Sequence, residues 1–442
     1  MSAFPPGGLA WILGIEDTSV YPPEHYDMAQ LDEHDLTGHN EHWREDLVAA
    51  RSLGATAIRY GVTWPRVHLA PGRFDWSELD ERLRFASDDL GLTVIADFVH
   101  YGTPTWLSES FADPRYPDAI AEFSAAFVDR YRGLVEHVTP LNEPLTTASF
   151  CGLRGVWPPA LTGWAGWVRV TLGIVDGIRR TIEAARAANP EAVIVHVEAS
   201  SLYMPAQPDL AEHAALLAAV AVLPTELLLG LVDDEHPMYE WLLQHGADAG
   251  RLASFQSAIP AIDFLGVNYY PDLTPRRLIR LGDSVEQVTT NRWADGLRAC
   301  LRYFADRFDV PILLTETSIE GDEALRTDWL AASVESIRDL REDGLDIRGY
   351  TWWPLIDFVD WSYASGGRNV EEFVLDRTAT DGATVPHAEQ YFADASAGRA
   401  TFFRRMGLLT LTEAPDGSLG RSTTAAARLF VALAAGQPEI AQ

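Results

Sequence analysis

The 442-residue chain is acidic, with 64 Asp and Glu residues against 34 basic ones and a formal net charge of −30. Every basic residue is Arg, and the absence of Lys excludes Schiff-base chemistry and a phosphate-loop lysine. The negative charge repels nucleic acid and anionic membrane surfaces, so we expect neither as a partner. The two cysteines, Cys151 and Cys300, belong to no Cys/His cluster with zinc-type spacing, so we expect no metal.

The N-terminal segment has no targeting signature. Residues 1–8 carry no basic segment, and the apolar run Leu9–Ile15 is short. No stretch approaches the length needed to span a bilayer. These features predict a cytoplasmic protein with no membrane partner.

Short apolar segments rich in β-formers recur along the chain and alternate with longer amphipathic segments. The longer ones, such as Trp43–Leu53 and Thr327–Glu342, place apolar residues three or four positions apart, which is typical of helices. In chain order the short segments are Leu9–Ile15, Thr56–Tyr60, Thr93–Phe98, His137–Leu141, Ala192–Val197, Phe264–Asn268, Pro311–Thr315 and Arg348–Trp352.

Eight strands alternating with helices predict an α/β fold with a parallel sheet. A closed (β/α)₈ TIM barrel and a doubly wound open sheet both fit this pattern. After the first strand the chain reads Gly14-Ile15-Glu16-Asp17-Thr18, which is no glycine-rich dinucleotide fingerprint, so the barrel is favoured.

The domain organisation is simple, since no Pro/Gly/Ser linker and no internal repeat divides the chain. We therefore predict a single domain over residues 1–442. Residues 366–399 are rich in Asp, Ala, Gly and Thr and do not follow the alternation of apolar strands and amphipathic helices. They are expected to form a long loop or subdomain beyond the eighth strand.

Polar residues follow the predicted strands at the points where the apolar runs stop. In a barrel these C-terminal strand ends converge on one pocket. The residues in such positions are Arg59, Asp97, His100, Asn142, Glu143, Asn268, Tyr270, Glu316, Trp353 and Asp357.

Glu143 and Glu316 follow strands four and seven, on roughly opposite sides of the predicted ring. Retaining glycoside hydrolysis needs two carboxyl groups about 5 to 5.5 Å apart, one to protonate the leaving oxygen and one to attack the anomeric carbon. The alternative is that each Glu only pairs with an Arg that lines the barrel mouth.

Two of these segments resemble motifs of glycoside hydrolase family 1, the β-glucosidase-like enzymes. Thr139-Pro140-Leu141-Asn142-Glu143-Pro144 is similar to the family's Asn-Glu-Pro motif, and Pro311-Ile312-Leu313-Leu314-Thr315-Glu316 to its nucleophile strand. Further segments resemble the family in the same order along the chain. They are Ile58–Val67, Asp263–Tyr270, Trp352–Trp361, and Met406–Leu409 followed by Ser422–Ala434.

The resemblance implies a role for each matching residue. Glu143 is the expected acid/base and Glu316 the expected nucleophile. Arg59 and Tyr270 are expected to hold Glu316 ionised, and Asn142 to bind the sugar 2-hydroxyl. The other positions implied to bind substrate are His100, Tyr101, Asn268, Trp353, Asp360 and Trp361.

The chain departs from the family at sugar-reading positions. Tyr101 stands where the family has Trp, and Asp360 stands where it has Glu. The family's first-strand Gln has no counterpart after Gly14, although Glu16 or Asp17 could take its role. These departures leave the identity of the donor sugar open.

The function that these features predict is hydrolysis of a β-linked glycoside by double displacement, with no cofactor. The expected partner is a small-molecule glycoside or oligosaccharide. Two alternatives remain: a transglycosidase that uses the same carboxylate pair, and a non-catalytic carbohydrate-binding barrel.

Overall fold

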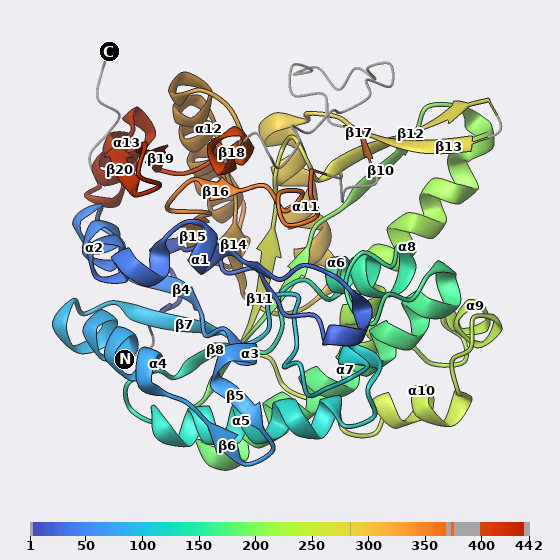
Figure 1. Ribbon diagram of the computed structural model, residues 1–442. Coiled ribbons are helices and arrows are strands. Elements are labelled where there is room, and N and C mark those ends of the chain that lie inside the picture. Colours follow the sequence, from blue (N-terminus) through green and yellow to red (C-terminus); the bar gives the residue numbers. More distant parts are fainter. Residues whose placement is uncertain (1–2, 283, 368–372, 375–397, 437–442) are drawn as a thin grey trace.

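The computed structural model describes residues 3–282, 284–367, 373–374 and 398–436, and its centre is a closed barrel of parallel strands (Figure 1). The first strand, β1, pairs with both β4 and β15 and so closes the ring. In order around the barrel the strands are β1 Ala10–Gly14, β4 Ala57–Gly61, β7 Thr93–Asp97, β8 His137–Thr139, β9 Val193–Ala199, β11 Phe264–Asn268, β14 Ile312–Glu316 and β15 Ile347–Trp352. The predicted TIM barrel is confirmed, and each predicted strand overlaps one of these.

The fourth strand is shorter than predicted, since β8 ends at Thr139 rather than Leu141. Pro140 follows it and has no N–H to donate to the strand ladder. The chain returns to the sheet at Asn142, which bridges Val197 of β9. This break directs the residues after β8 toward the C-terminal mouth of the barrel.

Helices follow the strands and surround the barrel (Figure 1). Helix α12 begins at Glu323, earlier than the predicted Thr327, because the Asp322 side chain accepts a hydrogen bond from Leu325 N at 2.9 Å and caps it. The longer helices are α2 His39–Ser52, α4 Ser77–Arg84, α5 Tyr116–Arg130, α7 Gly163–Ala188, α8 Ala211–Leu228, α11 Trp293–Arg307, α12 Glu323–Glu342 and α13 Ala425–Ala434. The shorter ones are α1 Glu33–Leu36, α3 Trp64–Val67, α6 Pro144–Ala148, α9 Tyr239–Gln244 and α10 Ala249–Phe255.

The barrel strands are apolar on both faces because one face fills the barrel and the other meets the helices. Ile12, Ile95 and Leu313 belong to a compact interior cluster that is separate from the larger core beneath the helices. Phe4 joins the interior cluster, with its ring 5.5 Å from that of Phe264 and 5.1 Å from that of His137. The N-terminal segment thus contributes directly to the barrel interior.

Smaller sheets lie outside the barrel, and β12 and β13 form a hairpin that projects next to α8 (Figure 1). These strands are β10 Leu202–Pro205, β12 Pro275–Leu281, β13 Ser284–Thr289 and β17 Phe373–Val374 in one sheet, with the pairs β2 Ser19–Val20 and β3 Leu31–Asp32, β5 His68–Ala70 and β6 Arg73–Phe74, β16 Phe358–Val359 and β18 Phe403–Arg404, and β19 Leu409–Glu413 and β20 Leu419–Thr423. Most of the predicted 366–399 insertion lies outside the described residues.

The expectation that no stretch of the chain is long enough to span a bilayer is wrong. In the described part of the chain, the segment Pro208–Leu228 is a helix long and apolar enough to cross a bilayer by length and composition. The core helix of a soluble protein passes the same test, and 61% of the most apolar window is buried inside the fold. The apolar character of α8 is thus explained by packing within this protein.

Candidate active site

A pocket opens at the C-terminal ends of the barrel strands, and both predicted catalytic glutamates line it. Glu143 is 8% exposed and Glu316 is 4% exposed, so solvent screens their charges little. Arg59 and Asn142 lie behind this surface and are fully buried. The other predicted residues that line the pocket are His100, Tyr101, Asn268, Tyr270, Trp353, Asp360 and Trp361.

Glu316 ends β14 and is held from two sides. The guanidinium of Arg59 donates from Nη1 to Glu316 Oε1, and the Tyr270 hydroxyl donates to Oε2 at 2.6 Å. Arg59 is itself fixed by hydrogen bonds from Nη2 to Asp97 Oδ2 at 2.5 Å and Asn142 Oδ1 at 2.7 Å. The lone pairs of Glu316 are therefore oriented by groups from β4 and the segment after β11.

The environment of Glu316 balances opposing effects. Burial raises the pKa of this carboxyl to about 8, and the charge of Glu143 acts in the same direction. Arg59, His100 and the hydrogen bond from Tyr270 lower that pKa and only partly offset burial. Glu316 therefore binds its proton more tightly than an ordinary glutamate does.

Glu143 accepts a hydrogen bond on each oxygen. The Tyr101 hydroxyl donates to Oε2 at 2.9 Å, and Asn268 Nδ2 donates to Oε1 at 2.8 Å. Asn268 is fixed in turn by the Thr315 hydroxyl, which donates to Asn268 Oδ1 at 2.7 Å. In the described part of the chain no Arg or His pairs with Glu143, which contrasts with the ion pair at Glu316.

The backbone at Glu143 is left-handed, with φ 47° and ψ 72°, and this residue is the N-cap of α6. An N-cap side chain usually accepts from the first backbone N–H groups of its helix, but Glu143 does not. Glu198 of β9 does so instead, because its Oε1 accepts from Leu145 N at 3.1 Å and from Ala199 N at 2.9 Å. The Glu143 carboxylate is consequently free to face the pocket.

Glu16, which follows β1, also lines the pocket. Its Oε2 accepts a hydrogen bond from Trp353 Nε1 at 2.9 Å. The indole can approach β1 this closely because Gly14 has no side chain; a Cβ there would lie 1.8 Å from Trp353 Cε3. Asp17 is absent from the pocket lining.

Asp360 lines the pocket, but its oxygens are already engaged. Oδ2 accepts from Arg404 Nη1 at 2.8 Å, and Oδ1 accepts from Ser362 N at 2.9 Å and from the Ser362 hydroxyl. Burial would raise the pKa of Asp360, but Arg404 and Ser362 outweigh it and lower that pKa. Arg404 lines the pocket as well, and the sequence alone did not identify it.

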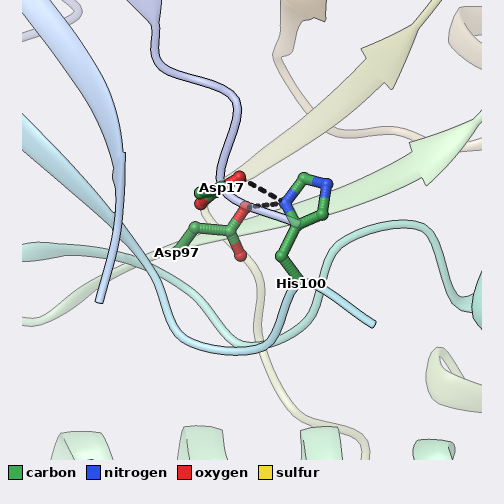
Figure 2. Close-up of side chains that lie close together, drawn as sticks. All are labelled: Asp17, Asp97 and His100. Carbon is green, nitrogen blue, oxygen red and sulfur yellow. Dashed lines mark hydrogen bonds and ion pairs between the residues drawn. The ribbon is translucent and has the colours of Figure 1, made fainter. Parts of the chain in front are cut away.

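Figure 2 shows His100 beside the carboxylates of Asp17 and Asp97, with Nδ1 2.7 Å from Asp17 Oδ1 and 3.2 Å from Asp97 Oδ2. Burial raises the pKa of Asp17 to about 6. Burial also lowers the pKa of His100, but the two aspartates outweigh this effect and raise the pKa of His100 well above its usual value. These three side chains lie close enough together to coordinate a metal ion. Arg59, 2.5 Å from Asp97, already supplies positive charge there and disfavours another cation.

Asp357 also follows a barrel strand, yet it does not line the pocket. Its carboxylate accepts from Gly407 N at 2.9 Å, Leu411 N at 3.2 Å and Arg405 Nη1 at 2.8 Å. Asp357 therefore fastens the C-terminal segment to the barrel, and the expectation that every such strand end meets in the pocket is wrong here.

The part of the pocket near α6, α7 and α8 is mainly apolar. Leucine and tryptophan side chains from these helices line it. The apolar residues that line this part are Leu145, Leu153, Trp164, Trp167, Leu217, Val220 and Leu273.

Comparison with known proteins gives a consistent match. The sequence profile of Glycosyl hydrolase family 1 matches residues 20–276, which include Glu143. Beta-glucosidase A of Thermotoga maritima is 23% identical over 358 residues, which cover 73% of this chain and 79% of that protein. The aryl-phospho-beta-D-glucosidase BglC of Bacillus subtilis is 23% identical over 395 residues, covering 73% of this chain and 78% of that protein.

Solved structures match over nearly the whole chain. A family 1 beta-glucosidase from Thermotoga maritima in complex with isofagomine lactam superposes with a TM-score of 0.76 at 16% identity, covering 99% of this chain and 100% of that one. Its complex with deoxynojirimycin gives a TM-score of 0.75 at 17% identity, covering 99% and 100%. At these identities the structural match establishes the shared barrel fold.

Proposed function

This chain belongs to glycosyl hydrolase family 1, and from that membership and the geometry of its pocket we propose that it hydrolyses a β-linked glycoside with net retention at the anomeric carbon. Glu316 is the nucleophile and Glu143 the acid/base in this proposal. The substrate is a small glycoside whose donor sugar lies among Trp353, Trp361 and Glu16.

In the first step, the ionised Glu316 attacks the anomeric carbon while Glu143 gives its proton to the glycosidic oxygen. The bond from that carbon to the leaving group breaks, and the alcohol departs with the proton. A glycosyl ester on Glu316 remains. Arg59 and Tyr270 support this step because both donate to the attacking carboxylate.

In the second step, Glu143, now a carboxylate, takes a proton from water as that water attacks the anomeric carbon. The ester bond to Glu316 breaks, so the sugar leaves with its original configuration and both glutamates regain their starting states. The Asn268 and Tyr101 hydrogen bonds hold the Glu143 carboxylate in place for this proton transfer.

The single observation that carries this proposal is that Glu143 and Glu316 line one pocket in different electrostatic surroundings. Glu316 pairs with Arg59, which alone would fit a structural ion pair. Glu143 has no such cation among the described residues, so an ion-pair role does not explain it. In addition, Trp361 Nε1 is buried without a hydrogen-bond partner in the described part of the chain and suits a sugar hydroxyl.

Azide rescue tests both assignments. Glu316→Ala is expected to abolish hydrolysis of an activated aryl β-glycoside, and azide to restore turnover with an α-glycosyl azide as product. In Glu143→Ala, azide is expected to attack the glycosyl-enzyme and to give a β-glycosyl azide. Product configuration determined by NMR distinguishes the two roles, and wild-type hydrolysis rates in Glu316→Ala would contradict the proposal.

A further inference from the structure

Tyr101 lies against Glu143, the proposed acid/base. Its hydroxyl lies 2.9 Å from Glu143 Oε2 and 3.1 Å from Asn142 Nδ2. Asn142 must present its NH₂ group to Tyr101, because its Oδ1 accepts from Arg59 Nη2 at 2.7 Å. The hydroxyl therefore accepts from Asn142 and donates to Glu143.

The Tyr101 ring is fixed by its neighbours. Ring centroids of His100, Trp157 and Trp361 lie 4.5, 5.3 and 5.5 Å away, and Tyr101 is buried. The backbone of Tyr101 is left-handed, with φ 74°, a conformation that costs a non-glycine residue free energy. A strained backbone and an aromatic enclosure together hold the hydroxyl on Glu143.

The hydrogen bonds run in one direction, from Asn142 through Tyr101 to Glu143, so each polarises the next. A donor aimed at a carboxylate stabilises the charged form over the acid. Asn268 supplies a second donor on the other oxygen, at 2.8 Å.

We propose that Tyr101 is a positioning residue for Glu143, whose hydroxyl stabilises the carboxylate and so sets the pH at which Glu143 loses the proton needed by the leaving group. This inference rests on the proposed acid/base role of Glu143. It concerns only proton affinity: in the reaction the proton passes between Glu143 and the glycosidic oxygen, and Tyr101 keeps its own.

A ratio of two substrates isolates this effect. A phenyl glycoside needs a proton on its leaving group, whereas a dinitrophenyl glycoside does not. Dividing kcat/KM for the first by kcat/KM for the second cancels the ionisation of Glu316 and any general loss of activity. With rising pH the ratio falls as Glu143 loses its proton.

For Tyr101→Phe we expect the midpoint of this fall to move to higher pH by about one unit, the size of a hydrogen bond to a charged group. Tyr101→Trp, which also lacks the hydroxyl, should show the same shift and serves as the second variant. Tyr350→Phe is the matched control, since its hydroxyl bonds Ser333 at 2.8 Å and lies outside the pocket.

An unchanged midpoint in Tyr101→Phe and Tyr101→Trp, with both substrates still cleaved, overturns the inference while leaving the proposed function intact. A wild-type protein that cleaves neither glycoside instead contradicts the proposed function, and this inference with it.

Discussion

Glu316 must be ionised to attack an anomeric carbon, yet its burial raises the pKa of this carboxyl to about 8. The site thus favours the protonated form at neutral pH, and the nucleophile becomes fully available only in mildly alkaline solution. Arg59 and Tyr270 reduce this penalty without removing it. The pH dependence of the reaction should report this balance.

With a dinitrophenyl glycoside, whose leaving group needs no acid, kcat/KM should rise with pH through a midpoint near pH 8, where half of Glu316 is ionised, and level off above it. Tyr270→Phe removes a hydrogen bond that lowers the pKa of Glu316, so the rise should shift upward by about one pH unit. Tyr269→Phe is the control, because its hydroxyl donates to Trp293 O at 3.0 Å instead. A profile centred near the ordinary glutamate range, about 4.3, would contradict this prediction.

Individual residue types and their placement after strands predicted much of the site. Glu143, Glu316 and their neighbours were found because barrel strands end at a shared mouth. The pairing of Asp360 with Arg404 could not be predicted, since Arg404 lies in a later segment whose path is set by tertiary packing. Glu198 directly follows the predicted strand Ala192–Val197 but was missed, because its position does not show which backbone groups it will meet.

At the scale of elements, the start of α6 depends on a residue from another strand. Glu198 supplies the acceptor for Leu145 N and Ala199 N, and burial raises its pKa well above the usual value. A neutral side chain with the same oxygen should therefore replace it well, whereas an apolar one should not.

We expect Glu198→Gln to leave the unfolding temperature nearly unchanged and Glu198→Leu to lower stability. The leucine leaves the buried Leu145 N–H without an acceptor, at a cost of about 1–3 kcal/mol, and also the partly buried Ala199 N–H. Differential scanning calorimetry of both variants measures the difference. Equal destabilisation by Gln and Leu would show that Glu198 acts through its charge rather than as a hydrogen-bond acceptor.

Across the whole molecule, the two ends of the described chain are fastened together. Arg421 of β20 donates to Asp46 of α2 through Nε at 2.7 Å and Nη2 at 3.0 Å, and His39 Nδ1 lies 2.9 Å from the same carboxylate. Burial alone would raise the pKa of Asp46, but the bonds from His39 and Arg421 outweigh it and lower that pKa.

A lowered pKa in the folded state means that Asp46 stabilises the fold above its unfolded pKa of about 3.9 and loses that contribution as the pH falls through the folded value. Asp46→Asn should therefore cost about 3 kcal/mol at pH 7, as expected for breaking a buried ion pair. The difference from wild type should shrink below about pH 4. Thermal unfolding at both pH values checks this; a difference independent of pH would exclude the ionic contribution.

The sequence predicted the order of the eight barrel strands because each is apolar on both faces and short. It did not predict the hairpin of β12 and β13 or its sheet with β10. Strand β12 carries Arg276, Arg277 and Arg280, and β13 carries Glu286 and Gln287, so this hairpin outside the barrel lacks the continuous apolar pattern that marks a buried strand. Helix α8 also has the length and apolar composition of a membrane-spanning helix, since burial between protein surfaces favours the same apolar residues.

Glu143 occupies the N-cap position of α6, but Glu198 accepts the hydrogen bond from the first turn of this helix, and this has a consequence for enzyme engineering. A graft of only the Asn-Glu-Pro segment onto another barrel would lack the acceptor that Glu198 supplies. The new acid/base carboxylate would then accept from the backbone N–H groups of its own helix instead of facing the pocket. The neighbouring strand and its buried glutamate must therefore be transplanted together with the motif.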